Sequence, residues 1–375
     1  MKLLPVLLLA LAPSLVAAQS ITPPPIAAKA FVLVDAQSGQ TLAGAAENDP
    51  FEPASLTKLM TAWITLDAIR TGQIEVNKVV TVSGNAAKAP GARMFLNPAQ
   101  QVPVSELLRG MIVQSANDAA VALAEVVAGS ESAFVARMNA QAARMGLANT
   151  HFANATGQPA AGHQASARDL AVLALAVIRD FPEHYALYSQ KEFTFNNMPQ
   201  GNRNRLLWTD PTVDGMKTGF TESAGYCLVA SARRGERRLV SVLLGAQSDT
   251  LRTTETQKLL NFGFLAYETR RLYSRGQSVA TPTIYKGTSS TVHLGFDRDV
   301  WVTMPRGKFT GIAAKLETRE PFVAPLAAGD KAGIMKLSRD NAPLVELPVV
   351  ALDDVPVAGF LSRGWDSLKL IFLSP

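Results

Sequence analysis

Apolar residues recur at helical spacing in several stretches of the first 270 residues. After Ser55 they occupy one face of an α-helix, at i, i+3, i+4, i+7 and i+8, and are Leu56, Leu59, Met60, Trp63 and Ile64. We expect this helix to begin at Ser55, with the serine at or near the N-cap. Other helices are predicted at residues 104–111, 117–127, 131–145, 167–178 and 253–267.

Continuous apolar runs between turn residues predict strands. Residues 30–35 and 41–43 flank a Gln-Ser-Gly-Gln turn, which predicts a strand, a turn and a returning strand. Residues 226–232 and 239–245 are joined by a short polar segment, Arg-Arg-Gly-Glu-Arg. We expect these two later runs to form a β-hairpin.

The pattern changes from about Thr281 onward. Short alternating segments are separated by Gly, Pro, Asn and Asp, and lie at residues 283–286, 291–294, 300–304, 333–337 and 344–347. Such a succession of short strands predicts a small all-β module.

The last residues form a different pattern again. Seven apolar residues share one helical face: Val357, Phe360, Leu361, Trp365, Leu368, Ile371 and Phe372. One interpretation is a helix packed on the β-module, and the other is a helix lying in a membrane surface. The terminal position and the aromatic residues favour the membrane surface, whereas the segment is too short and too charged to span a bilayer.

The first residues have the three parts of a secretory signal peptide. Lys2 supplies the positive charge, residues 3–11 the apolar region, and Val-Ala-Ala at 16–18 a small-residue cleavage site. A membrane-spanning helix is the alternative, but the apolar part is short and is interrupted by Pro5 and Pro13. We therefore expect an exported protein whose mature chain begins near Gln19.

Composition limits the classes of function. The chain has 375 residues, of which 47% are hydrophobic and 18% charged, so two domains are expected. Its net charge of +5 comes from dispersed Lys and Arg residues. Such a distribution is compatible with an anionic substrate or a membrane surface as binding partner, and it does not indicate a nucleic-acid partner. Oligomeric state stays open.

The sequence predicts neither a metal site nor a cofactor. Cys227 is the single cysteine, and it lies in an apolar run, so a buried small hydrophobe is favoured over a reactive thiol. The four histidines are scattered without metal-ligand spacing, and no Gly-rich phosphate loop is present.

Three short motifs combine hydroxyl, amine and amide groups, each at the end of a predicted element. Alone, each motif has a plain structural explanation, such as a helix cap or a strand end. Together they supply what nucleophilic catalysis requires, namely a hydroxyl, a base and donors for an oxyanion. In chain order they are Ser55-x-x-Lys58, Ser115-x-Asn117 and Lys217-Thr218-Gly219.

This ordered trio resembles the set found in penicillin-binding proteins and serine β-lactamases. Longer stretches resemble the low-molecular-mass penicillin-binding proteins that are D-alanyl-D-alanine carboxypeptidases. These stretches are residues 31–39, 52–61, 107–120, 146–152, 166–170 and 213–221. The likeness is close over about residues 27–270, and the β-module and the C-terminal helix match the usual layout of the family.

The resemblance implies an α/β (α+β) transpeptidase fold of the penicillin-binding and β-lactamase type. A small C-terminal all-β sandwich and a terminal amphipathic helix would follow. We expect a signal peptide at 1–18, a catalytic domain at 19–270, a β-rich domain at 271–356 and an anchoring helix at 357–375. The implied location is the periplasmic face of the inner membrane, and the implied ligands are peptidoglycan pentapeptides and β-lactams.

The family likeness also assigns roles to the first two motifs. Ser55 would be the acyl-forming nucleophile and Lys58 the base, and residues at i and i+3 share one side of a helix. The helix N-terminus and a second cation, Lys217, are expected to lower the pKa of Lys58. Ser115 would pass the proton to the leaving D-alanine, and Asn117 would hold the peptide carbonyl and orient Lys58.

The third motif is expected to bind substrate along an edge strand. Gly219 would allow the close approach of the substrate backbone, and Thr218 would donate to the terminal carboxylate. The N–H groups of Ser55 and Phe220 would form the oxyanion hole. Arg252 matches a second carboxylate anchor of the family, with an exposed arginine at a helix start as the alternative.

Two rival functions stay open at this level. A secreted β-lactamase shares the trio, but Glu192-x-x-x-Asn196, which has a spacing used by such enzymes, lies in an alternating segment that predicts a strand. A catalytically silent binding module is the second rival, which the intact trio disfavours. The sequence departs from the family pattern at Thr156, near which some relatives carry a histidine. This difference bears on the reaction rate and on substrate preference.

Overall fold

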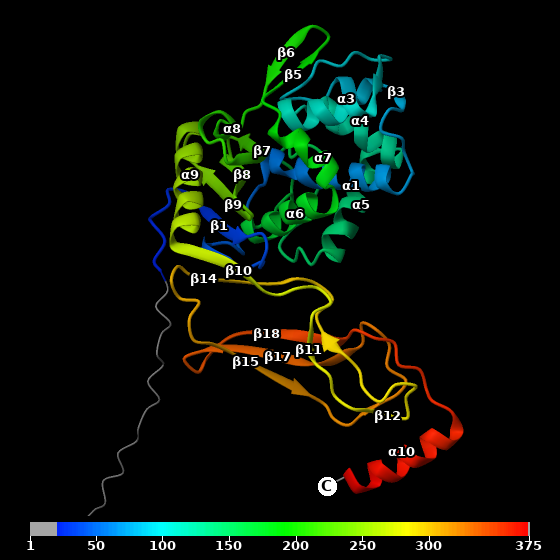
Figure 1. The fold of residues 1–375 in the computed structure, drawn as a ribbon. Coiled ribbons are helices and arrows are strands. Elements are labelled where there is room, and N and C mark those ends of the chain that lie inside the picture. The colour runs from blue at the N-terminus through cyan, green and yellow to red at the C-terminus, as the bar shows by residue number, and fades with distance from the viewer. Residues whose placement is uncertain (1–20, 374–375) are drawn as a thin grey trace, which may run out of the picture.

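A mixed α/β body and a smaller β-rich body follow each other along the chain (Figure 1). The structure is a computed structural model that describes residues 21–373, with side chains described as far as residue 371. The predicted signal peptide lies outside the described residues, as does the expected first mature residue, Gln19.

A five-stranded antiparallel sheet lies at the centre of the larger body. Its strand order is β2-β1-β9-β8-β7. The strands are β1 (Ala30–Asp35), β2 (Thr41–Ala45), β7 (Val213–Thr221), β8 (Gly225–Arg234) and β9 (Arg237–Ala246). The two predicted hairpins are confirmed as β1–β2 and β8–β9, and the strand that carries Lys-Thr-Gly, β7, is an edge strand.

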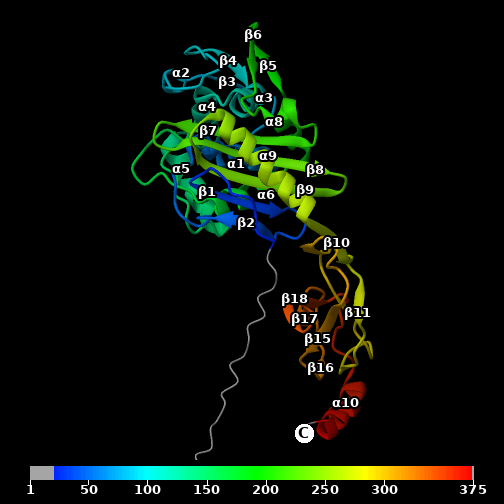
Figure 2. The ribbon, with the colours of Figure 1, turned by 90° about the vertical axis from the view of Figure 1, so that its left-hand side faces the viewer.

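Helices cover both faces of this sheet, which explains why its inner strands β1 and β9 are largely apolar. Along β1, Val32 and Val34 pack with α1 (Lys58–Arg70) and α6 (Ala167–Asp180) on one face. Phe31 and Leu33 alternate with them and pack with α9 (Asp249–Ala266) on the other. Figure 2 shows α9 lying across β8 and β9.

The remaining helices of this body stand beside the sheet. The predicted helices at 104–111, 117–127, 131–145 and 167–178 are confirmed, with ends that differ by a few residues. The set comprises α2 (Gly84–Ala87), α3 (Val104–Arg109), the π-helix η2 (Gly110–Gln114), α4 (Asn117–Ala128), α5 (Glu131–Arg144), α7 (Pro182–Tyr185), the 3₁₀-helix η3 (Ala186–Ser189) and α8 (Leu206–Thr209).

Two predicted helix starts are wrong. Ser55 is not an N-cap, because it lies inside the 3₁₀-helix η1 (Ala54–Thr57), and α1 begins only at Lys58 without a side-chain cap. The helix α9 begins at Asp249 rather than Thr253, because the Ser248 hydroxyl accepts a hydrogen bond from the Leu251 N–H and caps it there. The α1 start matters for the site, since it sets the geometry between Ser55 and Lys58.

The C-terminal body is built of strands, as predicted. One sheet has the order β11-β13-β18-β17-β15, β10 pairs with β14, and β12 pairs with β16. The strands are β10 (Tyr267–Tyr273), β11 (Ser278–Ala280), β12 (Ile284–Tyr285), β13 (Leu294–Gly295), β14 (Val300–Pro305), β15 (Ile312–Thr318), β16 (Phe322–Val323), β17 (Lys331–Arg339) and β18 (Ala342–Ala351). The expected boundary between residues 270 and 271 falls inside β10.

Two small antiparallel two-stranded sheets lie on the larger body. They are β3 (Val79–Thr81) with β4 (Gln101–Pro103), and β5 (Glu192–Phe195) with β6 (Met198–Gly201). In Figure 1 the β5–β6 hairpin projects from the top of the molecule, at the end farthest from the β-rich body.

A buried carboxylate links the two bodies. Asp35, at the end of β1, has no exposed surface and forms an ion pair of 2.8 Å with Arg237 in β9. It also accepts a hydrogen bond from the Thr269 hydroxyl in β10, and Thr269 lies 2.9 Å from Thr303 in β14, oxygen to oxygen. The junction therefore has a polar core that orders the first strand pair of the β-rich body.

The terminal helix α10 (Phe360–Leu373) contacts the β-rich body through its polar side. The Lys286 N–H donates to the Asp366 carboxylate over 2.7 Å. The apolar residues on its other side are exposed, and among the described side chains these are Phe360, Leu361, Trp365, Leu368 and Ile371. Among residues 21–373, no single helix is long and apolar enough to cross a membrane; only the sharply bent pair α4 and α5, taken together, meets that length and composition.

Candidate active site

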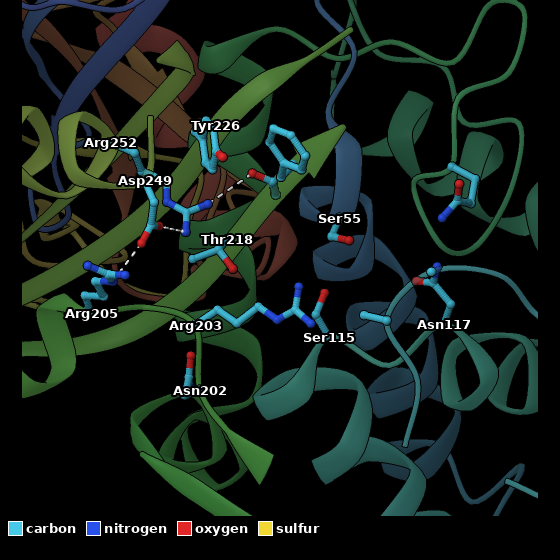
Figure 3. A pocket seen from close by; sticks show the side chains of 15 residues that line it. Ser55, Ser115, Asn117, Asn202, Arg203, Arg205, Thr218, Tyr226, Asp249 and Arg252 are labelled. Carbon is cyan, nitrogen blue, oxygen red and sulfur yellow. Dashed lines mark hydrogen bonds and ion pairs between the residues drawn. The ribbon is translucent and has the colours of Figure 1, made fainter. Parts of the chain in front are cut away.

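The three motifs meet at one cleft of about 530 Å³ (Figure 3). Ser55 lies on η1, Ser115 and Asn117 flank the start of α4, and Thr218 and Gly219 lie on β7. These segments are far apart in the sequence, so the fold brings together the groups that the motifs suggested. The described residues that line the cleft come from seven separate parts of the chain.

The amine of Lys58 lies beside the hydroxyl of Ser55. Lys58 Nζ is 3.1 Å from Ser55 Oγ, and it donates a hydrogen bond of 2.5 Å to the backbone carbonyl of Thr156. Lys58 is only 1% exposed although it is the first residue of α1. Because the 3₁₀ turn places Ser55 and Lys58 on one side, the amine contacts the hydroxyl without reaching through solvent.

Burial lowers the pKa of Lys58 to about 7, and the positive charge of Arg203 contributes in the same direction. The buried carboxylate of Asp118 opposes both. The sequence-based expectation named the helix N-terminus and Lys217 as causes; the expected direction is correct, but the main cause is burial and the cation is Arg203. A large fraction of Lys58 is thus neutral at neutral pH, as a general base requires.

A second buried lysine contacts Ser115. Lys217 Nζ donates to Ser115 Oγ over 2.7 Å and to the Thr218 carbonyl over 3.0 Å. Burial, followed by the charge of Lys58, holds the pKa of Lys217 well below its usual range. Ser115 has a left-handed backbone with φ of +68°, directly between η2 and α4. This conformation is uncommon outside glycine and is typical of functional positions.

Asn117 is expected to orient Lys58, but no hydrogen bond joins their side chains among the described residues. Its side-chain amide Nδ2 donates instead to the Pro90 carbonyl over 2.5 Å, and its backbone N–H donates to the carbonyl of Ala92. The Asn117 Oδ1 atom is buried and has no hydrogen-bond partner among residues 21–371. Since Asn117 lines the cleft, this oxygen is an acceptor available to a bound molecule.

Two glycines allow other segments to pack against the Ser55 turn. A Cβ atom on Gly157, whose φ is +88°, would lie 1.8 Å from the Ala54 carbonyl oxygen. A Cβ on Gly219 would lie 3.1 Å from the Ala54 Cβ and 3.2 Å from the Ser55 nitrogen. The contacts at Gly219 are thus with the protein's own Ser55 turn, and the expected close approach of a substrate backbone stays a prediction.

Arg252 is buried, which excludes the interpretation as an exposed arginine at a helix start. It is 6% exposed and donates to the carbonyl oxygen of Gly219 over 3.2 Å. Its guanidinium also pairs with Asp249, which forms a second ion pair of 2.7 Å with Arg205. Figure 3 shows Asp249 between the two arginines at one end of the cleft. Two cations and one carboxylate leave this end net positive.

Aromatic side chains border the same end. Phe220, on β7, is partly exposed, and its ring centroid lies 4.4 Å from that of Tyr226 on β8. The Arg252 guanidinium carbon lies 5.5 Å from the Tyr226 ring centroid. Thr218 is buried beside them and lines the cleft. The cationic end thus has an apolar rim.

Two arginines that follow β6 also lie at the cleft, and no sequence motif predicted them. They are Arg203 and Arg205, and in Figure 3 the side chain of Arg203 extends toward Ser115. Their segment reads Asn-Arg-Asn-Arg, in which Asn204 Nδ2 donates to the Gly215 carbonyl over 3.1 Å and ties it to β7. In the sequence they are simply two arginines shortly before Lys217, and their spacing matches no catalytic motif.

Three other predicted features have clear positions. Cys227 is buried on β8 and burial raises its pKa to about 11, so the structural interpretation is correct. Glu192 lies on strand β5, as its alternating segment predicted, and is not among the residues that line the cleft. The Thr156 hydroxyl donates to Asn154 Oδ1 over 2.9 Å, so its side chain shapes a turn while its carbonyl faces Lys58.

Comparison with known families identifies the chain. A family described as D-alanyl-D-alanine carboxypeptidase, peptidase S11, matches residues 17–248. A second, the penicillin-binding protein 5 C-terminal domain, matches residues 267–357. The chain belongs to the S11 family of D-alanyl-D-alanine carboxypeptidases, and the resemblance inferred from its motifs is confirmed.

Individual relatives agree with this assignment. D-alanyl-D-alanine carboxypeptidase DacC of Escherichia coli is 41% identical over 95% of this chain and 91% of its own length. The crystal structure of penicillin-binding protein 5 from Haemophilus influenzae superposes with a TM-score of 0.86 at 39% identity, over 90% of this chain and 99% of that one. Penicillin-binding protein D2 from Listeria monocytogenes, in an ampicillin-bound form, gives 0.60 at 28% identity, over 65% and 100%. The expected penicillin-binding fold is confirmed.

The glycine at position 157 provides a test of the packing around Ser55. Gly157→Ala is expected to lower the free energy of unfolding by more than about 3 kcal/mol, because it adds a clash with Ala54 to an unfavourable φ. Gly72→Ala is the matched control, since Gly72 has a φ of +73° and open space around its Cβ position, and it should cost only about 1 kcal/mol. Urea unfolding measures both, and equal losses would contradict the packing argument.

Proposed function

We propose that this D-alanyl-D-alanine carboxypeptidase releases the terminal D-alanine of peptidoglycan pentapeptides through an acyl-enzyme on Ser55. The observation that carries the proposal is the contact between a hydroxyl and a buried amine, 3.1 Å from Lys58 Nζ to Ser55 Oγ. A neutral amine at that distance is a suitable base for the hydroxyl proton.

Acylation begins with transfer of the Ser55 hydroxyl proton to Lys58 Nζ. The serine oxygen then attacks the carbonyl carbon of the penultimate D-alanine and forms a tetrahedral intermediate. The backbone N–H groups of Ser55 and Phe220 are the proposed donors to its oxyanion. Their proximity is supported by the close packing of Gly219 against the Ser55 turn.

Collapse of the intermediate breaks the carbon–nitrogen bond of the terminal residue. The leaving amine needs a proton, and Ser115 is the proposed donor. The proton that Lys58 took from Ser55 then returns to Ser115, with the Lys217 amine as relay, which leaves Lys58 neutral again. The 2.7 Å contact between Lys217 Nζ and Ser115 Oγ supports this relay. Water then attacks the acyl-enzyme with Lys58 again as base, which restores Ser55 and releases the shortened peptide.

Substrate is proposed to lie along the edge strand β7. An edge strand offers free backbone donors and acceptors to an extended peptide. The buried Asn117 Oδ1 is the proposed acceptor for a substrate amide, and Thr218 and Arg252 are the proposed partners of the terminal carboxylate. Binding of β-lactams at the same cleft is supported by the relative whose structure is an ampicillin-bound form.

The two rival functions are not favoured. Efficient serine β-lactamases of one class use a glutamate to activate the deacylating water, and Glu192 does not line this cleft. A silent binding module would not need two buried lysines beside two serines, because burying unpaired cationic groups is costly. Named carboxypeptidases at about 40% identity over most of the chain support the enzyme.

The proposed location is the periplasmic face of the inner membrane. Residues 1–18 would direct export, residues 19–270 would be the catalytic domain, and residues 271–356 would form a spacer. Residues 357–375 would lie in the membrane surface. The exposed apolar side of α10, opposite the side that contacts Lys286, supports this arrangement.

Substitution of the two central residues tests the chemistry. Ser55→Ala should abolish D-alanine release from a D-Ala-D-Ala pentapeptide. Lys58→Arg should slow acylation by a fluorescent penicillin at least about a hundredfold, because a guanidinium stays charged and does not act as a base. Lys88→Arg, at an exposed position, is the control. Release by Lys58→Arg at the wild-type rate would contradict the mechanism.

The pH dependence of acylation provides a second test. Lys58 acts as a neutral base, so the rate constant should rise as pH passes through the lowered pKa of about 7 and level off above it. Below pH 6 the rate should fall about tenfold per unit, as for a single required deprotonation. Stopped-flow measurement of acylation gives the profile, and a rise centred near pH 10 would show an ordinary lysine.

Vesicle binding tests the role of α10. The full chain should sediment with vesicles that contain anionic lipid, and a chain lacking residues 357–375 should not. Trp365→Ser with Leu368→Ser, on the exposed apolar side, should weaken binding by at least about tenfold. Ser367→Ala, in the same helix, is the matched control. Undiminished binding after the deletion would show that another surface holds the membrane.

A further inference from the structure

A buried histidine connects the nucleophile turn to the loop that contacts Lys58. His163 is 4% exposed, and its ring lies between two segments. The backbone N–H of Ala153 donates to Nδ1 over 3.1 Å, so this nitrogen is unprotonated. Nε2 therefore carries the hydrogen and donates to Thr57 Oγ1 over 2.8 Å. Thr57 stands between Ser55 and Lys58 in the chain.

The loop on the other side of the ring carries the acceptor for Lys58. A turn at residues 153–158 is organised by Asn154, whose Oδ1 accepts from the N–H groups of Thr156 and Gly157 over 3.1 and 2.7 Å. The Ala155 carbonyl accepts from the Thr61 hydroxyl in α1 over 2.7 Å. The Thr156 carbonyl then accepts from Lys58. The loop is thus bonded to α1 in two places, and His163 adds the third link, to η1.

The segment that carries His163 is itself fixed on both sides. Gln164 exchanges two backbone hydrogen bonds with His151, of 2.8 and 2.9 Å. Ala165 does the same with Phe51, which lies shortly before the nucleophile turn, over 2.8 and 3.0 Å. The ring also packs edge-on against Phe152, with centroids 6.0 Å apart. His163 is therefore a fixed point from which both hydrogen bonds act.

The charge state of the ring agrees with this arrangement. Three titratable groups face it, namely His151 on the paired segment, Glu52 ahead of η1 and Lys58 on α1. Burial, with His151, lowers the pKa of His163 to about 4, so the ring is neutral at neutral pH. A neutral ring has one donor and one acceptor, which matches its two partners.

We propose that His163 is a positioning residue for acylation. Its ring, bonded to Thr57 and Ala153, holds the Thr156 carbonyl against Lys58 and thereby aims the lone pair of the amine at Ser55. An amine that acts as a base must direct its N–H groups to acceptors and its lone pair to the hydroxyl. The Thr156 carbonyl is such an acceptor, so a loop that moved away would leave the amine free to rotate and to take up water.

The proposal predicts a shifted pH profile as well as a slower reaction. His163→Phe keeps an aromatic ring and removes both polar atoms, and it should lower the acylation rate constant about tenfold. Better hydration of Lys58 should raise its pKa and move the acid limb of the profile up by about one pH unit. His163→Gln, which keeps a donor and an acceptor, should restore most of the rate. His293→Phe, at an exposed histidine in the β-rich body, should leave the profile unchanged.

Thr57→Val keeps the test decisive if His163→Phe does not fold. This substitution replaces the hydroxyl that accepts from His163 by a methyl group of similar size and leaves the Nε2–H without its acceptor, so it should produce the same upward shift. A folded His163→Phe or Thr57→Val enzyme with the wild-type profile would overturn the proposal. The inference rests on the proposed role of Lys58, which Lys58→Arg tests in the same assay. An active Lys58→Arg would defeat the mechanism, whereas an inactive Lys58→Arg with unshifted His163 and Thr57 variants would defeat only the positioning role.

Discussion

The arrangement of the catalytic cleft depends on keeping one lysine amine out of water. Lys58 is almost completely buried, and burial disfavours its charged form strongly enough to bring its pKa to about 7. A buried amine still needs partners, and it has them in the Ser55 hydroxyl and the Thr156 carbonyl. The same constraint explains why glycine occupies positions 157 and 219. Without side chains there, a loop and a strand pack closely against the turn that carries Ser55.

The rest of the fold serves to hold these segments together. The central sheet is buried on both faces, so its edge strand β7 has a fixed position, and Lys217 is carried on it. The helix α1 is surrounded by the core and presents Lys58 from its first residue. Neighbouring cations contribute as well, because Arg203 disfavours a charged Lys58 and Lys58 in turn disfavours a charged Lys217. Packing and electrostatics therefore act on the same two amines.

Much of this was predictable from the sequence, for identifiable reasons. The sheet strands and most helices followed from apolar runs and helical spacing. The first two motifs lie at helix starts as expected, whereas the third lies inside β7 rather than at its end, and the fold brings all three together. The 3₁₀ turn at Ser55 was not predictable, because its apolar spacing also fits an α-helix that begins at the serine. Arg203 had no motif. The Thr156 carbonyl was also missed, because every residue has a backbone carbonyl and only the folded loop shows which one faces the amine.

Burial keeps a large fraction of Lys58 neutral near pH 7, and this property can be measured directly. In NMR spectra of the protein with ¹³C-labelled lysine side chains, one Cε resonance should titrate near pH 7. The loss of this resonance in Lys58→Arg would assign it to Lys58. We predict this midpoint in the free enzyme, and we expect the titration to leave that range once Ser55 is acylated and the contact is lost. A midpoint near 10.5, the ordinary value, would contradict the account.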